Sequence, residues 1–177
     1  MKKYEDKKVY YHTYNTLFGE MFFASIDEGL CMVSFMDGNI EKQFRWLKKY
    51  FREDNIIKKN TEKNIKAYRQ LEEYFSGKRK DFDLNIHLLG TTFQKQVWNI
   101  LGNIKFGKVW TYKAVAEELG DTNKCRAVGG AIGKNPISVI IPCHRVIGSN
   151  GKLTGFSAPD GILLKKRLLD LEKKHNL

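Results

Sequence analysis

The feature that most constrains this sequence is a cysteine followed by a histidine at the end of an apolar run. Residues 137–141 have the composition of a buried strand, and Pro142 separates them from Cys143 and His144. Adjacent side chains of an extended strand point to opposite faces, so the pair can act together only if Pro142 introduces a turn. An imidazole can then accept the thiol proton, directly or through water, to give the nucleophilic thiolate. A buried structural pair is the alternative that this dipeptide alone leaves open.

Positive charge is concentrated in the second half of the chain. Residues 1–90 contain 17 Lys and Arg against 14 Asp and Glu, a net charge of +3, whereas residues 91–177 contain 14 against 6, a net charge of +8. A basic half is typical of proteins with a polyanionic partner, most often nucleic acid. The alternative is a lysine-rich composition that only increases solubility.

The three cysteines indicate a reducing compartment, because an odd number at wide spacing does not form a disulfide framework. They are Cys31, Cys125 and Cys143. Cys31 lies in an apolar run and is expected to be an inert core thiol. The charged start lacks the apolar centre of a signal peptide, and no segment has the ~18 apolar residues of a membrane span. We expect a cytoplasmic protein, or a nuclear one in a eukaryote, and we expect no metal because zinc-ligand spacings are absent.

The first half of the chain predicts a small domain with an antiparallel sheet. Three segments alternate between apolar and polar residues: 8–16, 19–29 and 30–37. The turn signals between them favour a meander of antiparallel strands. Helical spacing follows at residues 40–50 and 60–77, and residues 78–90 read as an extended strand and linker. We predict an α+β fold whose residues 1–90 form an α/β domain.

The second half, residues 91–177, predicts a mostly helical domain. Helices are expected at residues 91–104, 111–120, 124–134 and 161–174, the last ending near Glu172. The second and third are short and joined by a turn, as in a helix-turn-helix. Short helix pairs also occur in purely structural settings, so this spacing leaves both DNA binding and a structural role open.

The third predicted helix has an almost bare surface. Its small residues are Ala127, Gly129, Gly130 and Ala131. Each glycine costs about 1 kcal/mol relative to alanine in a helix interior. A helix tolerates this cost when another helix or a phosphate backbone approaches it closely. Arg126 projects from this surface with Lys124 nearby, and it could enter a groove of DNA.

A larger constellation surrounds the Cys-His pair. It comprises Asn135-Pro136, PCHRV at 142–146, GSNG at 148–151, TGF at 154–156 and a K-x-x-LL-x-x-E helix that ends at Glu172. With FGKVWTYKAVAEELG at 106–120 and RAVGGAIGKNP at 126–136, it resembles the methylated-DNA–protein-cysteine methyltransferases, also called O6-alkylguanine-DNA alkyltransferases. The resemblance is close from residue 91 to residue 172, whereas residues 1–90 match the family only in general character.

The resemblance implies a catalytic role for each matching residue. Cys143 would be the alkyl acceptor and His144 its water-mediated base, with Glu172 orienting the imidazole. Asn135 would brace the active-site turn. Tyr112 would rotate the target phosphate and hydrogen-bond the base.

The resemblance also implies contacts with the guanine and with DNA. Val146 would contact the guanine through its carbonyl and Ser157 through its amide. Arg126 would fill the stack that the flipped base leaves, with the helix-turn-helix in the minor groove. The other expected DNA-contacting residues are Lys124, Ala127, Gly129 and Thr92.

The implied activity is a stoichiometric S-methyltransferase that flips O6-alkylguanine out of the duplex and takes its alkyl group onto Cys143. Extruding a base costs a few kcal/mol. The product is a stable thioether, so one turnover and no cofactor are expected. The implied partner is double-stranded DNA carrying O6-alkylguanine, with O4-alkylthymine as an alternative lesion. The chain is expected to act as a monomer, with cooperative binding on DNA as the alternative.

Three other classes of protein are alternatives. Non-catalytic alkyltransferase-like proteins usually carry tryptophan in place of the acceptor, whereas Cys143 is present here. Cys-His hydrolases usually draw the pair from distant positions, and no papain-like or caspase-like signature surrounds this cysteine. The third is a DNA-binding regulator with a structural cysteine. Methylation of Cys143 by alkylated DNA would separate all three from the alkyltransferases.

Overall fold

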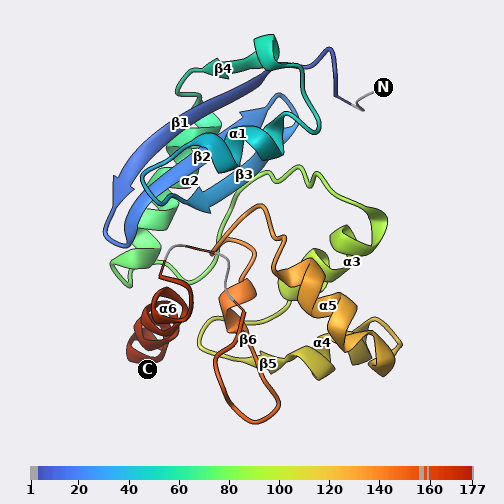
Figure 1. The fold of residues 1–177 in the computed structure, drawn as a ribbon. Helices are drawn as coiled ribbons and strands as arrows, with labels where there is room; N and C mark the ends of the chain where they lie inside the picture. The colour runs from blue at the N-terminus through green and yellow to red at the C-terminus, as the bar shows by residue number, and fades with distance from the viewer. Residues whose placement is uncertain (1–3, 156–157, 159, 177) are drawn as a thin grey trace. The chain divides into compact units, whose positions relative to one another are not determined.

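The computed structural model of the chain describes residues 4–155, 158 and 160–176. It divides into two compact units, Met1–Leu89 and Gly90–Leu177 (Figure 1). The first is built on a sheet and the second is mostly helical, which confirms the predicted α+β fold class. Within the described ranges, no helix is long and apolar enough to cross a membrane.

A four-stranded sheet in the order β3-β2-β1-β4 forms the centre of the first unit. The strands are β1 (Val9–Thr16), β2 (Gly19–Ile26), β3 (Gly29–Phe35) and β4 (Ile56–Lys58). The first three form the predicted antiparallel meander. The parallel pairing of β4 with β1 was not predicted, because three residues are too few to show an alternating pattern.

Two helices cover opposite faces of this sheet (Figure 1). They are α1 (Glu41–Leu47) and α2 (Glu62–Phe75), and the short turn η1 (Glu53–Asn55) precedes β4. Tyr11 and Phe22 lie on the face that meets Phe44 of α1. Tyr14 lies on the other face, where its ring stacks on Tyr68 of α2 at 4.0 Å. The period of two along a strand therefore gives each helix its own aromatic contact surface.

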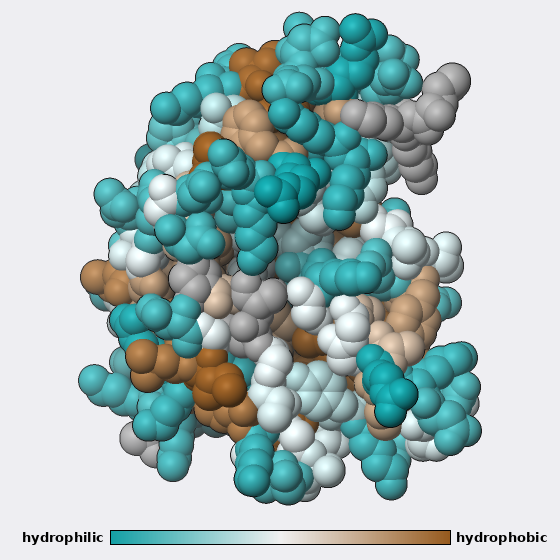
Figure 2. Space-filling view, in the orientation of Figure 1, coloured by the Kyte–Doolittle hydropathy of each residue, from teal (hydrophilic) through white to brown (hydrophobic). Residues whose placement is uncertain are grey.

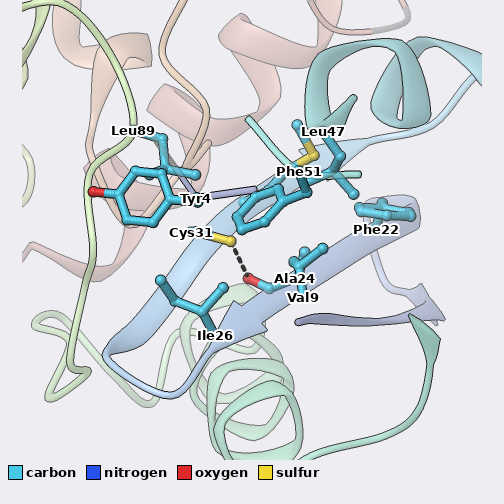
Figure 3. Close-up of a cluster of buried hydrophobic side chains, with 10 residues drawn as sticks. Tyr4, Val9, Phe22, Ala24, Ile26, Cys31, Leu47, Phe51 and Leu89 are labelled. Atoms are coloured by element: carbon cyan, nitrogen blue, oxygen red, sulfur yellow. Dashed lines mark hydrogen bonds between the residues drawn. The ribbon is translucent and has the colours of Figure 1, made fainter. Parts of the chain in front are cut away.

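Cys31 lies in the hydrophobic cluster on the α1 side of the sheet (Figure 3). Its side chain is fully buried, and its sulfur donates a hydrogen bond to the carbonyl of Ala24 at 3.4 Å. Burial raises the pKa of this thiol to about 12. Almost no thiolate therefore forms at neutral pH, as expected for a core thiol.

Residues 78–90 contain no strand, contrary to the prediction. A single bridge joins Ile86 to Leu30 of β3. Leu30 N donates to Asn85 O, and His87 N donates to Leu30 O, both at 2.8 Å. The segment is extended as predicted, but only one of its residues is in register with the sheet edge.

The described residues of the second unit form four α-helices and a small parallel sheet. The helices are α3 (Thr92–Leu101), α4 (Tyr112–Glu118), α5 (Cys125–Ile132) and α6 (Gly161–His175), and the strands are β5 (Trp110–Thr111) and β6 (Val146–Ile147). All four predicted helices are confirmed, and Thr91 caps α3 through a capping box with Gln94. The predicted ends differ by a few residues: α5 is shorter, and α6 extends almost one turn beyond Glu172.

Helices α4 and α5 are joined by Gly120 and the turn η2 (Thr122–Lys124). Gly120 has a φ of 80°, a conformation that favours glycine and ends α4. On its buried side, α5 contacts α3, and Trp98 Nε1 donates to Ala131 O at 2.9 Å. This contact fixes which side of α5 faces outward.

Residues 137–141 form a buried turn and not the predicted strand. Ile141 N donates to Ile137 O at 3.0 Å, and Val139 has a φ of 71°. This conformation costs a β-branched residue about 1–3 kcal/mol. A short apolar run indicates that a segment is buried, but its pattern cannot distinguish a buried strand from a buried turn.

Hydrophilic side chains predominate on the face drawn in Figure 2, as expected for a chain with 29% charged residues. The exposed large hydrophobic residues among those described are Leu17, Val109, Ile162 and Leu163. Leu17 and Val109 are isolated in the sequence, whereas Ile162 and Leu163 are neighbours in the first turn of α6. Exposed apolar side chains are common on protein surfaces.

Candidate active site

Cys143, His144 and Arg145 form a buried 3-10 turn, η3 (Cys143–Arg145), directly after Pro142. Cys143 N donates to Ile141 O at 2.8 Å, and Arg145 N donates to Pro142 O at 3.0 Å. The turn required for the two side chains to act together is therefore present. Successive side chains rotate about the turn, whereas on a strand they would alternate between two faces.

The side chain of Asn135 holds the backbone that leads to Cys143. Its Oδ1 accepts a hydrogen bond from Ile137 N at 3.0 Å, and its Nδ2 donates to Ile141 O at 2.9 Å. It also hydrogen-bonds the Cys143 sulfur. These bonds stabilise the buried turn and offset the strain at Val139.

The environment of the Cys143 sulfur acts on its pKa in two directions. Burial raises the pKa of the thiol and is the largest effect. The hydrogen bond from Asn135, the charge of Lys165 and backbone N–H groups lower it, without reversing the shift. A protonated thiol at neutral pH needs a base before it can act as a nucleophile.

His144 and Glu172 form a fully buried pair. His144 Nε2 lies 2.8 Å from Glu172 Oε1, and the side chains are 0% and 1% exposed. Burial lowers the pKa of His144, although the hydrogen bond and charge of Glu172 act against this. The imidazole is therefore neutral at neutral pH. An ionised carboxylate only accepts hydrogen bonds, so Nε2 carries the proton and Nδ1 carries the lone pair of a base.

Arg145, which the sequence did not predict as a site residue, keeps Glu172 ionised. Its Nη2 lies 2.8 Å from Oε1, and its Nε donates to Oε1 at 2.9 Å and to Oε2 at 3.1 Å. Burial raises the pKa of Glu172, but the hydrogen bonds and charges of His144 and Arg145 outweigh it and lower the pKa to about 2. While His144 is neutral, the charge that stabilises the carboxylate comes from Arg145.

Lys165 is a second site residue that was not predicted. It is fully buried, and its Nζ donates to Val146 O at 2.6 Å and to Thr154 O at 2.8 Å. Burial lowers its pKa, and a charge on Cys143 would raise it. The K-x-x-LL-x-x-E pattern held a signal for it, because a residue seven positions before Glu172 lies on the same helix face.

Tyr112 is linked to this group through a shared acceptor. At the first position of α4, its hydroxyl donates to Thr154 O at 3.1 Å, the same carbonyl that Lys165 binds. Val146, the predicted guanine contact, presents its carbonyl to Lys165. Ser157, the other predicted guanine contact, lies outside the described residues.

Most of the candidate DNA contacts lie on the outward side of α5 and before it. Lys124, Arg126 and Ala127 are exposed and Gly129 is half-buried, while Thr92 is exposed at the start of α3. Lys124 Nζ lies 3.4 Å from a carboxylate oxygen of Asp121.

The two glycines of α5 are not needed for packing among the described residues. A Cβ on Gly129 would meet only the ring of Tyr112, at an ordinary contact distance of 3.8 Å. A Cβ on Gly130 would meet nothing within 4 Å. The bare surface has two explanations: close approach of another helix or of a phosphate backbone. The described residues of this chain do not support the first explanation.

No three His, Cys, Asp or Glu side chains in the described ranges gather closely enough to hold a metal ion. The chemistry available in this group is that of a buried thiol, a neutral imidazole, an ionised carboxylate and two buried cations.

Two family models match the chain. Residues 9–88 match the 6-O-methylguanine DNA methyltransferase, ribonuclease-like domain, and residues 92–174 match the DNA binding domain of the same family. The chain is 42% identical over 168 residues to a methylated-DNA–protein-cysteine methyltransferase of Methanosarcina acetivorans, which covers 93% of this chain and 98% of that protein.

Further relatives agree with these matches. An inducible methylated-DNA–protein-cysteine methyltransferase of Bacillus subtilis is 39% identical over 153 residues, covering 86% of this chain and 84% of that protein. The crystal structure of Mycobacterium tuberculosis OGT in complex with DNA matches with a TM-score of 0.79 and 34% identity, and covers 94% of each chain.

Proposed function

Because the chain belongs to the methylated-DNA–protein-cysteine methyltransferase family, we propose that it flips O6-alkylguanine out of duplex DNA and transfers the alkyl group irreversibly to its own Cys143. The observation that carries this proposal is the buried hydrogen bond between Glu172 and His144, the residue that directly follows Cys143 in the turn η3. The sequence left open whether Cys143 and His144 are a purely structural pair. In the structure, His144 is hydrogen-bonded to an ionised carboxylate, as a general base requires.

The proposed chemistry begins with loss of the thiol proton to Nδ1 of His144 through a water molecule. The sulfur of Cys143 then attacks the alkyl carbon. The C–S bond forms as the bond from carbon to guanine O6 breaks, and the electron pair of that bond moves to the guanine. Glu172 stabilises the imidazolium that forms, because its carboxylate is already ionised and bonded to Nε2.

Tyr112 would donate a hydrogen bond to the departing guanine. Its hydroxyl has one proton, which it donates to Thr154 O in this structure. The bond to Thr154 must therefore break when the guanine enters. Lys165 keeps its own bond to that carbonyl, so Thr154 retains a partner during the exchange.

We expect a single turnover. A thioether has no leaving group that water displaces under mild conditions, and none of the described residues around Cys143 offers a route that regenerates the thiol. The protein is then consumed one molecule per lesion, without a cofactor.

For DNA binding, we propose that α4 and α5 act as a helix-turn-helix in the minor groove. The bare outward side of α5 would let the phosphate backbone approach, which offsets the helix-propensity cost of its two glycines. Arg126 would enter the stack in place of the flipped base, as wedges do in other minor-groove proteins. Lys124, Ala127 and Thr92 would contact the DNA alongside it, and the +8 charge of residues 91–177 would add phosphate contacts.

For the lesion itself, we propose that the Val146 carbonyl and the Ser157 amide contact the guanine. A carbonyl oxygen has two lone pairs, so Val146 can accept from Lys165 and from the guanine together. O4-alkylthymine is the second candidate lesion, and the chain is proposed to act as a monomer.

The test is transfer of a labelled methyl group from duplex DNA to the protein. Wild-type protein should become labelled, and Cys143→Ser should not. Cys125→Ser is the matched control, because Cys125 is the one cysteine of the three that is not buried, and this variant should be labelled like the wild type. Equal labelling of Cys143→Ser and wild type would refute the assignment. DNA binding without any labelling would favour the non-catalytic or regulatory classes.

A further inference from the structure

The turn at residues 104–107, which follows α3, is built around the buried ion pair of Arg145 and Glu172. The carbonyl of Ile104 accepts from Arg145 Nη1 at 2.5 Å, and the ring of Phe106 lies 5.8 Å from the guanidinium carbon. Gly107 N donates to Glu172 Oε2 at 2.8 Å. Three groups of one short turn therefore face the ion pair, and none of the roles proposed above uses them.

The two oxygens of the Glu172 carboxylate accept hydrogen bonds from different donors. Oε1 accepts from His144 Nε2 at 2.8 Å, and Oε2 accepts from the backbone N–H of Gly107 at the same distance. Arg145 bonds both oxygens, so it does not by itself decide which one faces the imidazole. A carboxylate held at both ends cannot rotate without losing a bond, and a backbone donor is more rigid than a side-chain donor.

Position 107 requires glycine for two reasons. Its φ is 72°, in the left-handed region that L side chains rarely adopt. A Cβ there would lie 2.4 Å from Cγ and 2.8 Å from Cβ of Asn176. Asn176 directly follows α6, which carries Glu172. A side chain at position 107 would displace either the turn or the end of α6, and both movements draw the Gly107 N–H away from Oε2.

We propose that Gly107 is a positioning residue for alkyl transfer, which acts by fixing the Glu172 carboxylate so that Oε1 faces His144. The inference rests on the proposed function of Cys143 and His144, and it adds the turn at residues 104–107 to the elements that the reaction needs.

A positioning role predicts a pH effect that loss of stability alone would not produce. The titratable and charged groups around His144 are Cys143 and Arg145 on its own turn, and Lys165 and Glu172 on α6. Without the N–H at Oε2, the carboxylate can turn away from His144. The hydrogen bond and charge that raise the pKa of the imidazole are then weakened, so this pKa falls. The neutral base then persists to lower pH, so the acidic limb of the rate profile moves to lower pH.

The experiment compares Gly107→Ala with Gly38→Ala. Gly38 has a similar φ of 81°, and a Cβ there would meet nothing within 4 Å, so it controls for backbone strain alone. With free O6-alkylguanine as substrate, Gly107→Ala should react up to about 100-fold more slowly, with its acidic limb at lower pH. Gly38→Ala should match the wild type in both. Equal rates and limbs for the two variants would overturn the proposal.

An NMR titration of His144 in unreacted protein separates this proposal from the proposed function. If the wild type transfers no alkyl group, the function fails, while a lowered His144 pKa in Gly107→Ala but not in Gly38→Ala still supports the positioning role. If Gly107→Ala does not fold, Phe106→Leu removes the ring beside Arg145 without adding backbone strain. It should shift the His144 pKa in the same direction, and an unchanged pKa in this variant would refute the role of the turn.

Discussion

Replacing Asn135 by alanine should both destabilise the second unit and weaken the nucleophile. In the structure, the Asn135 amide is bonded to Ile137 N, to Ile141 O and to the sulfur of Cys143. It is the side chain that closes the buried turn at residues 137–141, in which Val139 has a positive φ.

The expected loss of stability follows from these bonds one by one. Without the Oδ1 acceptor, the buried N–H of Ile137 loses its hydrogen bond, which costs about 1–3 kcal/mol. The bond to Ile141 O adds about 1 kcal/mol, because that oxygen still accepts from Cys143 N. We therefore expect Asn135→Ala to lower the free energy of unfolding by about 3 kcal/mol.

The assay is urea unfolding followed by tryptophan fluorescence in a Trp46→Phe background. Trp46 is the only one of the three tryptophans in the first unit, so the remaining signal reports on Trp98 and Trp110. Asn103→Ala is the matched control, because Asn103 is exposed and should change stability by less than about 0.5 kcal/mol. A loss for Asn135→Ala as small as that of the control would refute the reasoning.

The same variant gives a second, independent readout. The hydrogen bond from Asn135 lowers the pKa of the Cys143 thiol, so its loss should raise that pKa. The rate of Cys143 modification by iodoacetamide, followed by peptide mapping, should then reach its midpoint at a higher pH than in the wild type.

Three further predictions test other parts of the site. Arg126→Ala should reduce repair of duplex DNA far more than reaction with free alkylguanine, since the arginine lowers the cost of base flipping and touches no reacting atom. Equal losses on both substrates would assign Arg126 to the chemistry or the fold. Iodoacetamide should leave Cys31 unmodified in the native protein and modify it after unfolding, because burial raises the pKa of this thiol to about 12 and keeps the reagent from the sulfur. Labelling of Cys31 in the native protein would contradict its position in the buried core. As the pH is lowered, the rate of alkyl transfer should fall only below the ordinary histidine pKa of about 6.5, because burial lowers the pKa of His144 and the neutral base persists to lower pH. A fall that begins above this value would show a charged imidazole at the site.

The sequence was sufficient to predict elements whose pattern is long and regular. The meander from β1 to β3 follows from alternation and turn signals, and α3 follows from its apolar spacing and the Thr91 cap. Strands of two or three residues, such as β4 and β5, could not be predicted because no periodicity can be seen over so few positions.

The turn at residues 137–141 shows a different limit. Its apolar residues predicted burial correctly, but the conformation depends on the Asn135 side chain, which bonds the backbone at Ile137 and Ile141. Arg145 and Lys165 were not predicted as site residues, because a charged residue is usually expected at the surface. Both are buried, since Arg145 pairs with Glu172 and Lys165 is bound by two backbone carbonyls, and neither contact can be read from sequence spacing.

The central claim is that Cys143 accepts one alkyl group from O6-alkylguanine and is then permanently inactive. The most direct measurement is intact mass and peptide mapping after incubation with an excess of duplex DNA that contains O6-methylguanine. We predict one methyl group per protein molecule, located on Cys143, and consumption of one equivalent of the lesion. Consumption of several equivalents per protein molecule, or a methyl group on Cys31 or Cys125 with Cys143 unmodified, would contradict the claim.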